Sequence, residues 1–99
     1  ELLKRIRQEI YYNYNEFNTI LKSKEFRKYF DGIDDYYKAK LAPKDYPAGF
    51  DGIDILKNKS YTVSWALDER IIHSEKLFKT AVTVCKAILP YNDFLRKAL

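Results

Sequence analysis

The sequence predicts an α+β fold, with amphipathic helices at both ends of the chain and a small antiparallel two-stranded β-ribbon between them. Near both termini, apolar residues recur at three- and four-residue steps, which places them on one face of a helix. Between these stretches, two short segments alternate apolar and polar residues, a pattern typical of strands. We expect the 99 residues to form one domain or half-domain, residues 1–99.

The N-terminal third of the chain is expected to be helical. Residues 1–21 carry one apolar stripe, made of Leu2, Leu3, Ile6, Ile10, Tyr14, Phe17 and Leu21. Ser23 is a favoured N-cap residue and predicts a second, shorter helix over residues 24–30. Gly32 then ends that helix, because glycine tolerates the left-handed conformation that follows many helices.

The middle of the chain contains the two expected strands. They are residues 36–41 (YYKAKL) and residues 60–67 (SYTVSWAL), and both are rich in aromatic or β-branched side chains. The prolines and glycine of residues 43–49 indicate a loop. Asp51 is placed to cap a single helical turn over residues 52–56.

The C-terminal third is again expected to be helical. Asp68 and Ser74 are favoured N-cap residues, and they precede a short turn at residues 69–72 and a long helix at residues 75–89. We expect Pro90 to end the long helix, because proline lacks the N–H that the preceding turn requires. A final amphipathic helix then runs to the end of the chain.

The composition is that of a globular protein, with 46% hydrophobic and 32% charged residues. The net charge of +4 is spread over both halves, whereas nucleic-acid-binding proteins concentrate basic residues on one face. No apolar run approaches the roughly 18 residues that span a bilayer. The chain opens at Glu1 within a helical pattern and contains no Met, so we expect it to be a piece of a longer protein. A lone unpaired cysteine favours a reducing compartment, so we expect that protein to be cytoplasmic.

Residues that commonly carry catalysis or bind metals are few. Cys85 lies on an apolar stripe, which predicts a small buried side chain, and His73 is expected at the surface. A zinc site needs several such ligands. The FDGID sequence at residues 30–34 recurs at residues 50–54 but lacks the pattern of a calcium loop, so we interpret both copies as turns. We expect no catalytic residue, no metal and no cofactor in this chain.

One basic cluster is a candidate anion-binding site. It comprises Lys57, Lys59 and Ser60, which follow the predicted helical turn, together with Lys44 in the preceding loop. Lysine ammonium groups act as point charges toward anions. The alternative is a solvated loop, whose lysines keep the edge of the ribbon from pairing with other chains.

Several tyrosines form a candidate interface. The chain has nine, and those that exceed the needs of one small core are Tyr11, Tyr12, Tyr36, Tyr37 and Tyr46. Tyrosine suits positions that are dry at one end and wet at the other, as at an interface between polypeptides. The alternative is a set of stacking platforms for single-stranded nucleic acid.

Short motifs along the chain resemble a known family when they are taken in order. They read IRQEI (residues 6–10), KEFRKYF, KLAPKDYP, DILKNKSYTVSWALDE and LPYNDFLRKAL. In this order they are similar to the C-terminal half of the bacterial DUF2461 family, in which LKxxPKGF, LKxKSF and P…FLNRAL stretches follow one another. The chain departs from that pattern at Asp45-Tyr46 and at Arg96-Lys97.

The resemblance implies no established function. The family's signature, RxxRDxRFxxxxK, belongs to the N-terminal half and is absent here, so no catalytic residue carries over. We expect a non-catalytic structural or interaction part that packs against the N-terminal half and self-associates without it. This interpretation predicts an apolar, tyrosine-rich face larger than a monomer normally exposes. Two alternatives remain, namely a wall of an enzyme pocket for an anionic substrate and a weak nucleic-acid-binding module.

Overall fold

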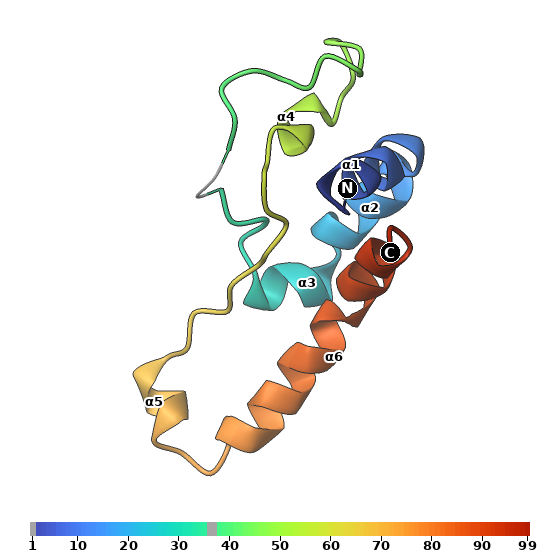
Figure 1. Ribbon diagram of the computed structural model, residues 1–99. Coiled ribbons are helices and arrows are strands. Elements are labelled where there is room, and N and C mark those ends of the chain that lie inside the picture. Colours follow the sequence, from blue (N-terminus) through green and yellow to red (C-terminus); the bar gives the residue numbers. More distant parts are fainter. Residues whose placement is uncertain (1, 36–37) are drawn as a thin grey trace.

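The computed structural model describes residues 2–35 and 38–99, and in these residues the fold is helical (Figure 1). Helix accounts for 56% and strand for 2% of the structure, so the predicted α+β class is wrong. The helices of the described part are α1 (Leu2–Tyr12), α2 (Tyr14–Lys22), α3 (Lys24–Tyr29), α4 (Ile53–Leu56), α5 (Glu69–Ile72) and α6 (Leu77–Arg96).

The predicted first helix is two helices, α1 and α2, which are separated at Asn13. The backbone of Asn13 has φ −123° and ψ 39°, outside the helical region, and its side-chain amide donates to the Glu9 carboxylate (3.0 Å). The apolar stripe nevertheless continues across the break, because Ile10 and Phe17 are both fully buried.

Two of the four predicted N-caps are confirmed, and two, Asp51 and Ser74, are wrong. The Ser23 hydroxyl accepts a backbone hydrogen bond from the third residue after it (3.3 Å) and begins α3. The Asp68 carboxylate likewise accepts one from the second residue after it (2.9 Å) and begins α5. Asp51 does not cap α4, whose N-cap is Gly52 without a side-chain bond. Local capping chemistry is therefore readable from the sequence at two of the four predicted helix starts.

Helix α6 differs from the prediction at both ends. It begins at Leu77 rather than directly after Ser74, and it continues through Pro90 to Arg96, so two predicted helices are one. Tyr91, the residue after the proline, is almost completely buried. Burial of the apolar face on both sides of Pro90 outweighs the one hydrogen bond that proline removes.

The predicted β-ribbon is absent from the described residues. Residues 60–67 are extended but form no strand, and of residues 36–41 the first two lie outside the described part of the chain. Lys38, in the first segment, forms an isolated antiparallel bridge with Asn58, which lies two residues before the second segment. Alternating side chains predict an extended backbone, but they do not provide the continuous partner that a strand needs.

A carboxylate stands beside the extended segment where a partner strand was expected. The Asp34 N–H donates to the Thr62 carbonyl (2.9 Å). The Asp34 carboxylate in turn accepts hydrogen bonds from the hydroxyls of Thr62 (3.1 Å) and Ser64 (2.7 Å). The polar side of the predicted strand is thus held by one aspartate rather than by backbone pairing.

The core lies where α2, α3 and α6 meet, and it is largely aromatic. Phe17 stacks near Phe94 and Tyr91, with ring centroids 4.9 and 5.7 Å apart, and Phe26 lies 5.5 Å from Tyr91. These four side chains are among the most buried in the protein. Aromatic pairs at such distances contribute both burial and favourable ring contacts.

The molecule is elongated, with extents of 49 × 24 × 24 Å. Figure 1 shows α5 and the first half of α6 extending from the core at one end, and the loop around α4 lying at the other. The radius of gyration is 15.2 Å, against about 13 Å for a compact domain of this length. None of the described helices is long and apolar enough to cross a membrane.

Candidate interaction surface

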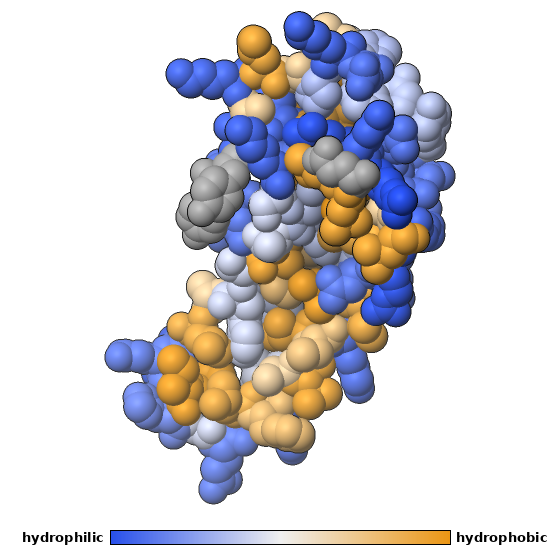
Figure 2. All heavy atoms as spheres, viewed as in Figure 1, coloured by the Kyte–Doolittle hydropathy of each residue, from blue (hydrophilic) through white to orange (hydrophobic). Residues whose placement is uncertain are grey.

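The end of the molecule beyond the core exposes apolar side chains. We call the set formed by Leu67, Ile71, Ile72 and Leu77 the arm surface; it comprises α5 and the chain on either side of it. Leu67 is 44% and Ile72 43% exposed, while Ile71 and Leu77 are half-buried. Figure 2 shows apolar residues gathered over α5 and the beginning of α6, whereas much of the opposite end is polar.

The exposed area of the whole chain is large for its mass. It measures 7390 Å², whereas a compact monomer of the same mass exposes about 5,900 Å². The excess, about 1,500 Å², is more than the roughly 800 Å² that one partner contributes to a standard protein–protein interface. The surface area therefore leaves room for at least one interface with another polypeptide.

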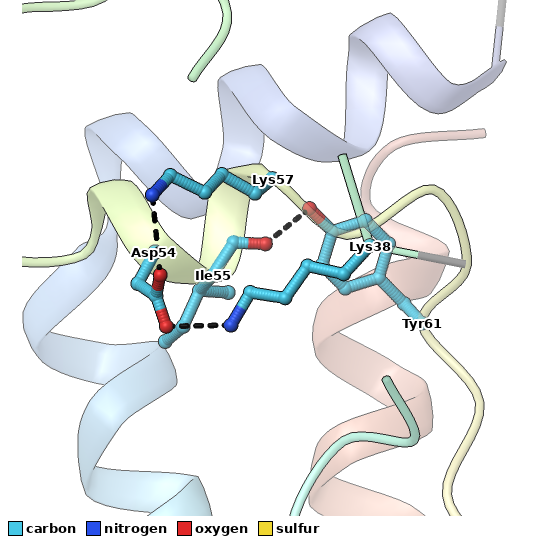
Figure 3. Close-up of polar contacts among 5 residues, drawn as sticks. All are labelled: Lys38, Asp54, Ile55, Lys57 and Tyr61. Atoms are coloured by element: carbon cyan, nitrogen blue, oxygen red, sulfur yellow. Dashed lines mark hydrogen bonds and ion pairs between the residues drawn. The ribbon is translucent and has the colours of Figure 1, made fainter. Parts of the chain in front are cut away.

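The candidate anion-binding lysines are only partly free. Lys57 Nζ lies 3.5 Å from the Asp54 carboxylate, which also binds Lys38 Nζ at 2.5 Å (Figure 3). These bonds, chiefly the one from Lys38, lower the pKa of the Asp54 carboxyl. Lys44 and Lys59 are exposed, and Ser60 is half-buried. Because the Asp54 carboxylate is already paired with Lys57, the four candidate residues form no preassembled anion site around Lys57. Their anion-binding role stays a prediction.

Sequence reasoning missed a buried polar cluster next to these lysines. Tyr61 donates its hydroxyl to the Ile55 carbonyl (2.9 Å; Figure 3), and Arg7 donates to the Asn58 carbonyl (3.3 Å). Burial raises the pKa of Tyr61 to about 12, although the positive charge of Arg7 opposes the shift. These groups are up to 54 positions apart in the chain, so no local pattern indicates that they meet.

Of the candidate interface tyrosines, two pack within the chain and one is exposed to solvent. The Tyr11 ring lies 5.0 Å from that of Tyr46 and 4.8 Å from that of Phe50, so it packs the loop before α4 onto α1. Tyr12 is 77% exposed. Tyr36 and Tyr37 lie outside the described residues. An intermolecular role for this set stays a prediction, and two of its members have an intramolecular one.

The predicted burial of Cys85 is wrong, whereas the predicted surface position of His73 is confirmed. Cys85 is exposed rather than buried, because it lies on the side of α6 that faces away from the core. His73 is exposed at the end of α5. Helical periodicity placed Cys85 on the apolar stripe of the predicted helix, whereas the residues of α6 that the fold buries are Val84, Tyr91 and Phe94.

A protein-family model described as a conserved hypothetical protein (DUF2461) matches residues 1–94 of the chain. The chain belongs to the DUF2461 family. Searches of curated proteins and of solved structures gave no match. DUF2461 is a family of unknown function, so the arrangement of side chains on this DUF2461 chain is the basis for any functional proposal.

Proposed function

We propose that this chain is a structural and interaction part of its DUF2461 protein, and that the arm surface packs against an N-terminal half of the same protein. The observation that carries the proposal is the apolar end beyond the core, where Leu67 and Ile72 are exposed on a segment held by few core contacts. Covering such side chains with another apolar surface stabilises an assembly by about 25 cal/mol per Å².

The shape of the chain supports the same proposal. A compact domain would fold α5 and the start of α6 onto its own core, but here they extend beyond it (Figure 1). Asp34 holds Thr62 and Ser64, and Val63 and Trp65 pack against the core, so the uncovered apolar side chains begin at Leu67 and continue along α5. A second polypeptide layer lying on the arm surface would complete a two-layer domain.

The test is to produce the N-terminal half as a separate chain and titrate it into this one by calorimetry. We expect saturable binding that Ile72→Ser weakens about tenfold, because it removes apolar area from the contact. His73→Ser, at the neighbouring exposed position, serves as the matched control and should bind as the parent does. Absence of binding, or equal loss in both variants, would contradict the proposal.

The enzyme-wall alternative has weaker support. It requires Lys44, Lys57, Lys59 and Ser60 to converge on an anionic substrate, whereas the Lys57 ammonium is already paired with the Asp54 carboxylate. The same calorimetry with inorganic phosphate in place of the N-terminal half tests this alternative directly. Saturable phosphate binding that is lost in Lys57→Gln would favour it over the interaction role.

A further inference from the structure

The outward side of α6 carries a second apolar stripe, which the fold leaves uncovered. Its members are Phe78, Val82, Cys85 and Leu89, which we call the outer stripe. Phe78 is 77%, Val82 38% and Leu89 49% exposed, and Cys85 is exposed as well. At about 100° per residue, the outer stripe is centred about 160° from the buried face of the same helix. The stripe is also separate from the arm surface, which lies on and around α5.

The spacing within the outer stripe selects a helix as its partner. The four residues follow one another at steps of four, three and four, which is the a/d spacing of a coiled-coil seam. They cover about 16 Å along the helix axis. A surface that touches only solvent has no need for this spacing, whereas knobs-into-holes packing against a second helix requires it.

We propose that the outer stripe pairs with the same stripe of a second copy of this chain, with the two α6 helices parallel about a twofold axis. In this arrangement every stripe residue meets its own counterpart, so the surface is self-complementary. The core of each copy lies on the far side of its α6 and does not obstruct the approach.

The charges beside the outer stripe favour the parallel orientation. Lys79 and Lys86 flank it on one side, and Ala81 and Ile88 flank it on the other. Parallel helices place the basic flank of each copy against the apolar flank of the other, where lysine stems can cover apolar surface with their ammonium groups in water. Antiparallel helices would instead bring the lysines of the two copies together, which is destabilising.

The exposed area is sufficient for this second contact. The chain exposes about 1,500 Å² more than a compact monomer of its mass. An interface at the lower end of the standard size buries about 600 Å² on each partner, so the excess area is enough for two such interfaces. The proposed pairing rests on the outer stripe alone and does not depend on the contact proposed for the arm surface.

The first experiment measures the mass of this chain by light scattering over a range of concentrations. We expect a dimer whose dissociation constant rises at least tenfold in Val82→Glu, which places a charge in the middle of the outer stripe. Thr83→Glu adds the same charge one exposed position away from the stripe and should dimerise as the parent does. A monomer at all concentrations, or an equal effect of both substitutions, would overturn the proposal.

The second experiment fixes the orientation with a short bis-maleimide cross-linker, on the chain carrying Cys85→Ser and Asn92→Cys. Asn92 continues the outer stripe one step beyond Leu89 and is exposed. Parallel helices place the two new thiols side by side, whereas antiparallel helices separate them by about 25 Å. We expect efficient cross-linking, and a dimer that does not cross-link would overturn the proposed orientation. Because neither experiment uses the N-terminal half or Ile72, failure here is distinguishable from failure of the proposed function.

Discussion

Single side chains, rather than a sheet, hold the extended segments of this protein in place. The Tyr91 hydroxyl donates to the Tyr61 carbonyl (2.6 Å), and the Tyr61 hydroxyl donates to the Ile55 carbonyl (2.9 Å). Both phenols are buried, so their hydroxyl groups bond in an environment where water does not compete. This chain of bonds links α6, the extended segment and α4.

The buried phenols make stability fall at high pH. Burial raises the pKa of Tyr61 to about 12, and it raises the pKa of Tyr91 as well, against about 10 for tyrosine in an unfolded chain. Between pH 10 and 12 the folded state therefore holds these protons more tightly, and the free energy of unfolding decreases as the pH rises. Below pH 10 this contribution is fully present.

Urea unfolding at pH 9 and pH 11.5 checks this prediction. In Tyr61→Phe, the loss of stability between the two pH values should be smaller than in the parent, by an amount on the order of 2 kcal/mol. Tyr12→Phe is the control, because Tyr12 is 77% exposed. An equal loss in the parent and in Tyr61→Phe would show that this phenol is not buried as described.

A glycine next to α4 offers a second prediction at this scale. A Cβ atom at Gly52 would lie 2.5 Å from a ring carbon of Tyr14 and 3.0 Å from one of Phe50, whereas at Gly49 it would meet nothing within 4 Å. We expect Gly52→Ala to lower the free energy of unfolding by about 1–3 kcal/mol through overpacking. Gly49→Ala should change it little, and equal effects in thermal unfolding would contradict the packing described here.

At the residue scale, the sequence predicts what depends on near neighbours and misses what depends on distant ones. Ser23 and Asp68 cap helices as expected, because the bonds involved span two or three positions. The bonds of Tyr91 and Asp34 span about 30 positions, and no local spacing encodes them. For the same reason the pairing of Lys57 with Asp54 is foreseeable within one helical turn, whereas the participation of Lys38 is not.

Among the elements, α6 shows most clearly how tertiary burial overrides a local signal. Pro90 has no N–H to donate to the carbonyl of Lys86, yet the helix continues for six more residues. Tyr91 and Phe94, which follow the proline, are each 1% exposed. Burying these two rings against α2 and α3 stabilises the last turns by more than the lost hydrogen bond costs.

Replacing this proline should stabilise the protein. Pro90 is exposed, so Pro90→Ala restores a backbone donor and a good helix former without disturbing the core. We expect the free energy of unfolding to rise by about 1–2 kcal/mol, after allowing for the greater freedom of the unfolded chain. Urea denaturation measures it, with Asn92→Ala as a control in the same helix. A decrease in Pro90→Ala would indicate that the proline shapes α6 in a way the core needs.

Helices were easier to predict than extended segments in this chain. A helix satisfies its own backbone, so the apolar periods of residues 2–22 and 77–96 were enough to identify helical structure, although not its breaks. A strand needs a partner strand, and residues 60–67 have instead one backbone hydrogen bond, from Asp34 to Thr62, and the contacts of the Asp34 side chain. Alternation therefore predicted a strand at residues 60–67 that is absent, because no partner strand lies beside it in the described residues.

At the scale of the whole molecule, the apolar surface that the resemblance led us to expect is present in part. The exposed side chains that form it lie near α5 and along α6, and they are aliphatic residues and Phe78 rather than the tyrosines proposed from the sequence. Sequence periodicity indicated one apolar stripe in the C-terminal helix. It could not indicate which face of α6 meets the core, because that depends on where α2 and α3 pack.

The measurement that tests the interaction role most directly is hydrogen exchange of this chain alone and within the full-length DUF2461 protein. The peptide to follow is residues 65–78, which contains α5 and the arm surface. We predict fast exchange in the isolated chain, and exchange slowed at least tenfold in the full-length protein, because a covered segment opens less often. Equal exchange rates of residues 65–78 in the two proteins would contradict the proposal that the arm surface packs against the N-terminal half.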